Sequence, residues 1–91
     1  MTREVIPTGA FRRDYKRLSN SPRYDMADLK TVVAALAEDQ PLDPPCRDHA
    51  LTGNWRDHRE CHIKPDWLLV YRLEAGRLIL VRTGTHAALF R

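Results

Sequence analysis

Long hydrophobic runs, cysteine pairs and a secretion signal are all missing from this sequence of 91 residues. The longest apolar runs, such as Trp67 to Tyr71, are far shorter than the roughly 20 residues that cross a bilayer. The first residues contain neither an apolar core nor a cleavage site, so we expect a cytoplasmic protein with no membrane partner. In the cytoplasm the two cysteines, Cys46 and Cys61, stay reduced and form no disulfide framework.

The composition is that of a folded and slightly basic protein. Apolar residues make up 43% of the chain, and its length predicts a single domain over residues 1–91. The net charge of +3 lies entirely in residues 47–91, together with all four histidines and both tryptophans. A polyanionic partner fits this distribution, but a solvated charged surface explains so small a charge equally well.

Two helices are predicted in the first half of the chain. A strand over residues 3–6 is followed by a helix that begins after Thr8, its predicted N-cap. A second helix is predicted to run from its N-cap Ser21 to about Glu38. Two helices joined by a short break suggest an antiparallel helical hairpin. The apolar residues of the first helix recur at helical spacing and are Phe11, Tyr15 and Leu18.

The second half predicts a mainly antiparallel sheet. Ala75-Gly76 is a tight-turn signal between two apolar stretches, and residues 86–90 form a short tail. The predicted fold class is therefore α+β, with two N-terminal helices packed on a small, mainly antiparallel sheet. Strands are predicted within residues 46–51 and over residues 55–63, 67–74 and 77–83.

Histidines gather around the strand predicted over residues 55–63. Alternation along that strand places four polar side chains on one face, where they either meet solvent or line a site. His49 precedes the sheet, His86 directly follows the last strand, and Asp66 lies in a proline turn after His62. Strand ends and loops are where functional residues concentrate. The four residues on the shared face are Arg56, His58, Glu60 and His62.

Two unrelated chemistries use such residues. Cys46-x-x-His49 and His58-x-x-Cys61 have the spacing of zinc ligands, but residues three apart on a strand point to opposite faces, which disfavours a shared metal.

The other chemistry is RNA cleavage, in which the ribose 2′-OH attacks the neighbouring phosphate. Imidazoles suit both proton transfers because their pKa, about 6.5, lies close to the pH of the cell. Arginine or lysine stabilises the phosphate charge, and an aromatic ring stacks on an unpaired base.

Three stretches of the second half carry a family resemblance. They are Arg47 to Leu51, His62 to Tyr71 and Arg82 to Phe90, the last reading RTGTHAALF. Residues 46–91 closely resemble the YafQ branch of the RelE/ParE toxin superfamily, and the N-terminal half agrees in plan. The resemblance implies a RelE-like fold and the toxin of a type II toxin–antitoxin system. Such toxins are ribosome-dependent endoribonucleases that cut mRNA in the ribosomal A site and need no metal or other cofactor.

The resemblance also implies partners and functional residues. A cognate DinJ- or RelB-like antitoxin inhibits the toxin, and operator DNA is bound only through that antitoxin. His86 is expected to be the general acid, His62 and Asp66 the base or the groups that orient the 2′-OH, and His49 a supporting group. Three residues are expected to contact or position the mRNA, and they are Trp67, Arg82 and Phe90. The alternative is that Trp67 is a core residue and that Phe90 is a hydrophobic contact that holds the tail in place.

Two alternative functions share this fold. One is a catalytically silent relative that only binds RNA or an antitoxin, but such a protein has no need of the complete set that includes Asp66 and His86. The other is a ParE-like toxin directed at DNA gyrase, which does not need acid–base residues. The three imidazoles of the set therefore favour the endoribonuclease.

Overall fold

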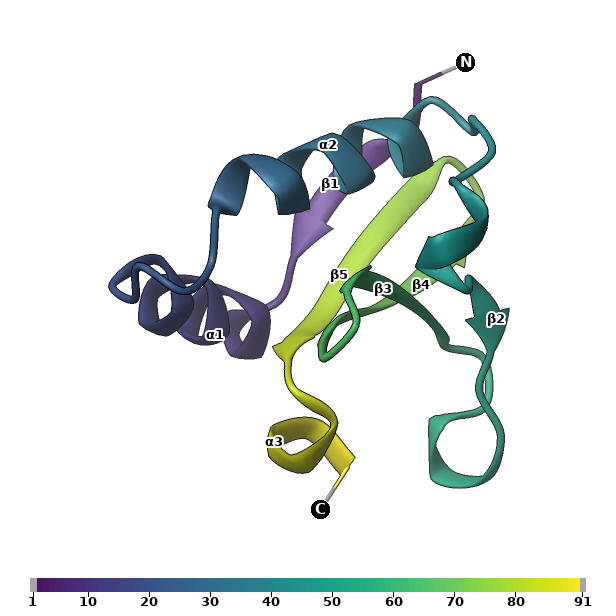
Figure 1. Cartoon of the computed structure of the whole chain (residues 1–91). Helices are drawn as coiled ribbons and strands as arrows, with labels where there is room; N and C mark the ends of the chain where they lie inside the picture. The colour runs from purple at the N-terminus through teal and green to yellow at the C-terminus, as the bar shows by residue number, and fades with distance from the viewer. Residues whose placement is uncertain (1, 91) are drawn as a thin grey trace.

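A computed structural model describes residues 2–90 as a five-stranded sheet between two layers of helix (Figure 1). The strand order is β1-β5-β4-β3-β2, with β1 parallel to β5 and every other pair antiparallel. The predicted α+β class with a mainly antiparallel sheet is confirmed. No helix in residues 2–90 has the length and apolar character to span a membrane. The elements are β1 (Glu4–Pro7), α1 (Gly9–Ser19), α2 (Met26–Ala37), β2 (His49–Ala50), β3 (Arg59–Lys64), β4 (Trp67–Glu74), β5 (Arg77–Gly84) and α3 (His86–Phe90).

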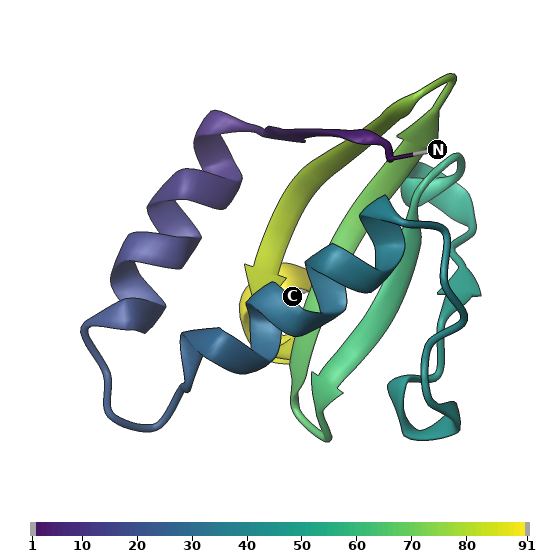
Figure 2. The same cartoon turned by 90° about the horizontal axis from the view of Figure 1, so that it is seen from above.

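The two N-terminal helices cover one face of the sheet. Thr8 caps α1 as predicted, because its hydroxyl accepts a hydrogen bond from the Phe11 amide. The predicted start of the second helix is wrong: α2 begins at Met26, and Asp25 is its N-cap. Ser21 instead closes a turn by accepting a hydrogen bond from the Arg23 amide. The helices diverge from that turn and do not pack as a tight hairpin (Figure 2).

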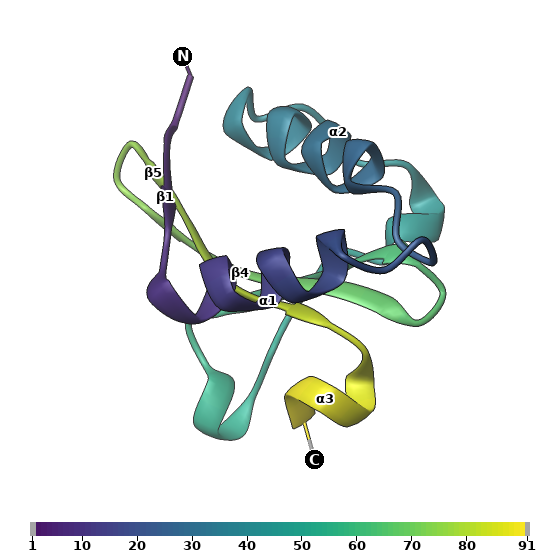
Figure 3. The same cartoon turned by 90° about the vertical axis from the view of Figure 1, so that its left-hand side faces the viewer.

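Strand β4 lies in the middle of the sheet and is buried on both faces. Trp67, Leu69 and Tyr71 pack under α1 and α2. Leu68 and Val70 face the other way, against Leu89 of α3. Figure 3 shows α3 on the side of the sheet opposite α2. The uninterrupted apolar run in this strand is therefore explained by burial on two faces.

The second half departs from the prediction in two places. The strand expected over residues 55–63 begins only at Arg59, because the preceding residues form a 3-10 turn and Asp57 has a φ of 71°. The expected tail is the short helix α3. Gly84 turns the chain into it with a φ of 155°, and a Cβ there would lie 3.5 Å from Leu89 Cδ2.

Candidate active site

Three segments bring imidazoles together on the α3 face of the sheet. His62 lies on β3, two residues from Glu60 and on the same face. His49 on the edge strand β2 pairs directly with Glu60. His86 is the first residue of α3, which Gly84 turns back over the sheet. Sheet pairing and one glycine turn thus place the three histidines around one carboxylate.

Glu60 is the centre of this cluster and is only 4% exposed. Its Oε1 lies 3.3 Å from His86 Nε2 and 3.8 Å from His62 Nε2, and its Oε2 lies 3.6 Å from His49 Nε2. An ionised carboxylate only accepts hydrogen bonds, so each contact is favourable when the facing nitrogen carries a proton. Two of the three imidazoles are also reachable from solvent, since His49 and His86 are about half exposed.

Backbone carbonyls and a second carboxylate orient the rings. His49 Nδ1 lies 2.6 Å from the Arg47 carbonyl and His62 Nδ1 lies 3.2 Å from the Pro65 carbonyl, and these contacts turn the Nε2 of each ring towards Glu60. His86 Nδ1 lies 3.9 Å from the exposed Asp66 carboxylate. All four predicted acid–base residues are thus brought together: His49, His62, Asp66 and His86.

The same cluster has the composition of a metal site. The ligand atoms of Glu60, His62 and His86 lie within 4.8 Å of one another. Two imidazoles and a carboxylate suit zinc or copper. The alternative cysteine–histidine set is not assembled in residues 2–90, because Cys61 is fully buried under the helices whereas His58 lies outside β3.

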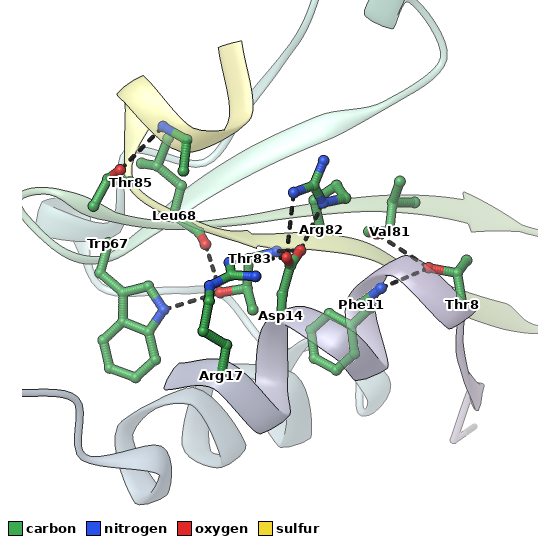
Figure 4. A network of polar contacts seen from close by, with 11 residues as sticks. Thr8, Phe11, Asp14, Arg17, Trp67, Leu68, Val81, Arg82, Thr83 and Thr85 are labelled. Carbon is green, nitrogen blue, oxygen red and sulfur yellow. Dashed lines mark hydrogen bonds and ion pairs between the residues drawn. The ribbon is translucent and has the colours of Figure 1, made fainter. Parts of the chain in front are cut away.

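Trp67 and Arg82 belong to one polar network around the end of β5, with Trp67 under the helices and Arg82 reaching Asp14 of α1 (Figure 4). The Trp67 indole is 2% exposed and donates to the Thr83 hydroxyl at 2.9 Å, so its ring is not open to a nucleobase in this conformation. Arg82 donates to Asp14 of α1 through Nε at 2.6 Å and Nη2 at 3.2 Å. Both predicted RNA contacts therefore tie β5 to the core just before His86.

Asp14 is the anchor of this network and is 2% exposed. Burial alone would raise its pKa, but hydrogen bonds from Arg82, the Thr83 amide and Arg17 outweigh burial and lower the pKa below its usual value. Asp14 therefore stays ionised and holds α1 against the end of β5.

Phe90 lies beside the histidine cluster. Its ring centroid is 5.9 Å from that of His86 and 5.5 Å from that of Trp55, and the ring is partly buried. In this position Phe90 can help to hold the His86 ring in place. A cavity of about 480 Å³ next to His62 is also lined by Arg47 and by Lys64, whose Nζ lies 3.4 Å from Asp28 Oδ2 of α2.

Two residues of these networks were missed as site residues from the sequence. Glu60 was placed on the right face, but its burial depends on α3, which was predicted only as a tail. Asp14 lies three residues after Phe11 and four before Leu18, so helical spacing already indicated a core-facing carboxylate. Arg56 and His58 were expected beside Glu60, but the 3-10 turn places them before β3.

The fold and the polar cluster define a small α+β toxin of the RelE-like class, because the solved structures that match closely are bacterial toxins. The family model described as the bacterial toxin of the type II toxin–antitoxin system, YafQ, matches residues 3–91. The chain therefore belongs to the YafQ family, and the resemblance read from its motifs is confirmed.

Three relatives illustrate the similarity. The mRNA interferase toxin YafQ of Escherichia coli strain K12 is 39% identical over 89 residues, which cover 97% of this chain and 96% of the relative. A copper-bound mutant toxin from Helicobacter pylori has a TM-score of 0.92 at 41% identity, over 99% of this chain and 100% of that chain. The E. coli DinJ–YafQ toxin–antitoxin complex has a TM-score of 0.87 at 38% identity, over 100% of both chains.

Proposed function

We propose that this toxin is an endoribonuclease that cuts mRNA in the ribosomal A site by acid–base catalysis without a metal. The observation that carries the proposal is the cluster of three imidazoles around Glu60, with Asp66 on the outer side of His86. The E. coli relative is named an mRNA interferase. The match to the YafQ family supports this activity over a gyrase-directed toxin, and the complete histidine set supports it over a silent relative.

The proposed reaction needs two proton transfers. A base, His62 or Asp66, removes the proton from the ribose 2′-OH, whose oxygen then forms a bond to the adjacent phosphorus. The bond from phosphorus to the 5′-oxygen breaks, and His86 protonates that leaving oxygen. The products are a 2′,3′-cyclic phosphate and a 5′-hydroxyl. Glu60 orients the imidazoles, and His49 supports the cluster from β2.

Cations beside the cluster are proposed to stabilise the charge on the phosphate. Arg47 lines the cavity next to His62 and suits this role, whereas Lys64, which also lines it, pairs with Asp28 of α2 at 3.4 Å. Arg82 is placed to anchor α1 through Asp14, so we propose that its contribution is mainly to position the end of β5. Phe90 is proposed to support His86.

The proposed partners follow from the family. The E. coli relative is solved in complex with the antitoxin DinJ, so we propose that a DinJ- or RelB-like antitoxin inhibits this toxin and that operator DNA is bound only through it. Action on ribosomes places the protein in the cytoplasm. The family match over residues 3–91 supports one toxin domain over residues 1–91.

A second property is favoured by the ligand geometry. We propose that Glu60, His62 and His86 bind a transition-metal ion that inhibits the toxin. A metal on the imidazole nitrogens occupies the lone pairs that carry protons in the reaction. The H. pylori relative is solved with copper, which agrees with a metal-binding capacity in this family.

The experiment that tests the activity uses ribosomes programmed with a defined mRNA. We expect wild-type toxin to cut within the A-site codon, and to leave the same mRNA intact when ribosomes are omitted. An mRNA with a single 2′-deoxy nucleotide at the cut position should resist cleavage there, because it lacks the attacking oxygen. Cleavage of the 2′-deoxy mRNA at an unchanged rate would refute the proposed chemistry.

A further inference from the structure

Strand β2 has little backbone pairing of its own. It contains two residues, both exposed, between a 3-10 turn at Pro44–Cys46 and another at Gly53–Trp55. Within residues 2–90 it pairs only with β3, and it forms one edge of the sheet. Yet β2 carries His49, whose Nε2 must stay near Glu60 for the cluster to be complete. So short an edge strand needs another attachment to hold this geometry.

A buried hydroxyl supplies an attachment one residue earlier. Asp48 accepts a hydrogen bond from the Tyr71 hydroxyl on β4 and another, at 3.3 Å, from Arg59 Nε on β3. Tyr71 is 1% exposed, so its hydroxyl needs a partner inside the protein. Burial, followed by the hydrogen bond to Asp48, raises the pKa of Tyr71, so the hydroxyl keeps its proton and remains a donor.

The alternation of side chains links this attachment to the histidine. Ala50 pairs with Arg59, and Arg59 pairs with Tyr71, so these residues form one row on the helix-covered face. Asp48 lies on that face, and His49 projects from the opposite face towards Glu60. The Arg47 carbonyl, in the same segment, is 2.6 Å from His49 Nδ1. Fixing Asp48 therefore fixes both the backbone and the ring orientation of His49.

We propose that Tyr71 and Arg59, acting through Asp48, are positioning residues that hold His49 in the catalytic cluster. The effect on cleavage rests on the function proposed above for His49. These residues lie on the far face of the sheet and act only by placing the imidazole. A displacement of about 1 Å in a reacting group is enough to lower a rate by about 100-fold.

A double-mutant cycle separates positioning from general stability. Asp48→Ala should lower A-site cleavage by about 10- to 100-fold, whereas Asp48→Asn, which keeps an oxygen acceptor, should retain most activity. In a His49→Ala background, Asp48→Ala should have no further effect. A loss by the same factor in both backgrounds would overturn the proposal. The matched control is Glu74→Ala, which breaks an ion pair with Arg72 on the same sheet.

Imidazole NMR signals give a second readout that does not depend on cleavage. In Tyr71→Phe and Asp48→Ala the His49 signal should shift and broaden, while the His62 signal stays in place. Tyr15→Phe, at a partly buried tyrosine outside this contact, should leave both signals unchanged. An unchanged His49 signal overturns the proposal. If wild-type toxin fails to cut mRNA on ribosomes, the proposed activity is wrong, and these signals still decide whether Asp48 positions His49.

Discussion

Removal of the buried Asp14 carboxylate tests how strongly the network under β5 holds the fold. In Asp14→Ala the guanidinium of Arg82 loses two hydrogen bonds and the Thr83 amide loses one. The Arg82 side chain is 29% exposed and can be solvated again, whereas Thr83 is fully buried. Breaking a buried pair costs 3–5 kcal/mol, so we expect a loss of about 3 kcal/mol at the lower end of that range. Domains of this size have unfolding free energies of about 5–15 kcal/mol, so the variant should still fold.

Urea unfolding measures this loss of stability, and the lowered pKa of Asp14 predicts how the loss depends on pH. The lowered pKa of Asp14 means that the unfolded chain binds the proton more tightly, so the contribution is complete above the usual aspartate pKa and disappears as pH falls through the folded-state value. The difference in unfolding free energy between wild type and Asp14→Asn should therefore become smaller at acid pH. Asp39→Asn, which breaks an exposed pair with Arg3, should cost less than about 1 kcal/mol. An equally small loss for Asp14→Ala would refute the reasoning.

Three further predictions concern the histidine cluster. Glu60→Gln keeps the shape but removes the charge shared by the imidazoles, and should slow single-turnover cleavage by about 100-fold; an unchanged rate would contradict its central role. Added Zn²⁺ or Cu²⁺ should inhibit cleavage reversibly, with recovery on chelation, and a Glu60→Gln toxin should bind the ion more weakly in calorimetry. Phe90→Ala should change kcat more strongly than KM, with kcat decreasing, because the ring packs on His86. A change confined to KM would indicate a substrate contact instead.

Local patterns in the sequence predicted most of the elements. Thr8 and the apolar spacing of α1 identified the first helix, and the glycine turn identified the hairpin of β4 and β5. The start of α2 was misplaced because Ser21 and Pro22 form a good N-cap pair by themselves. Asp25 directly precedes Met26 and caps α2 by accepting a hydrogen bond from the Ala27 amide.

The arrangement of the site was harder to predict than its members. The motifs indicated His49, His62, Asp66 and His86 in separate segments, but their convergence on Glu60 depends on the pairing of β2 with β3 and on the turn into α3. The burial of Trp67 likewise follows from tertiary packing against α1 and α2. Such contacts join residues far apart in the chain and leave no local pattern.

The measurement that tests the central claim most directly compares wild-type toxin with His86→Ala on programmed ribosomes. His86 is about half exposed and lies between Glu60 and Asp66, so its truncation should leave the fold intact. We predict cuts in the A-site codon for wild type and a rate lower by at least about 100-fold for the variant. Equal cleavage by a folded His86→Ala toxin would contradict acid–base catalysis by this cluster.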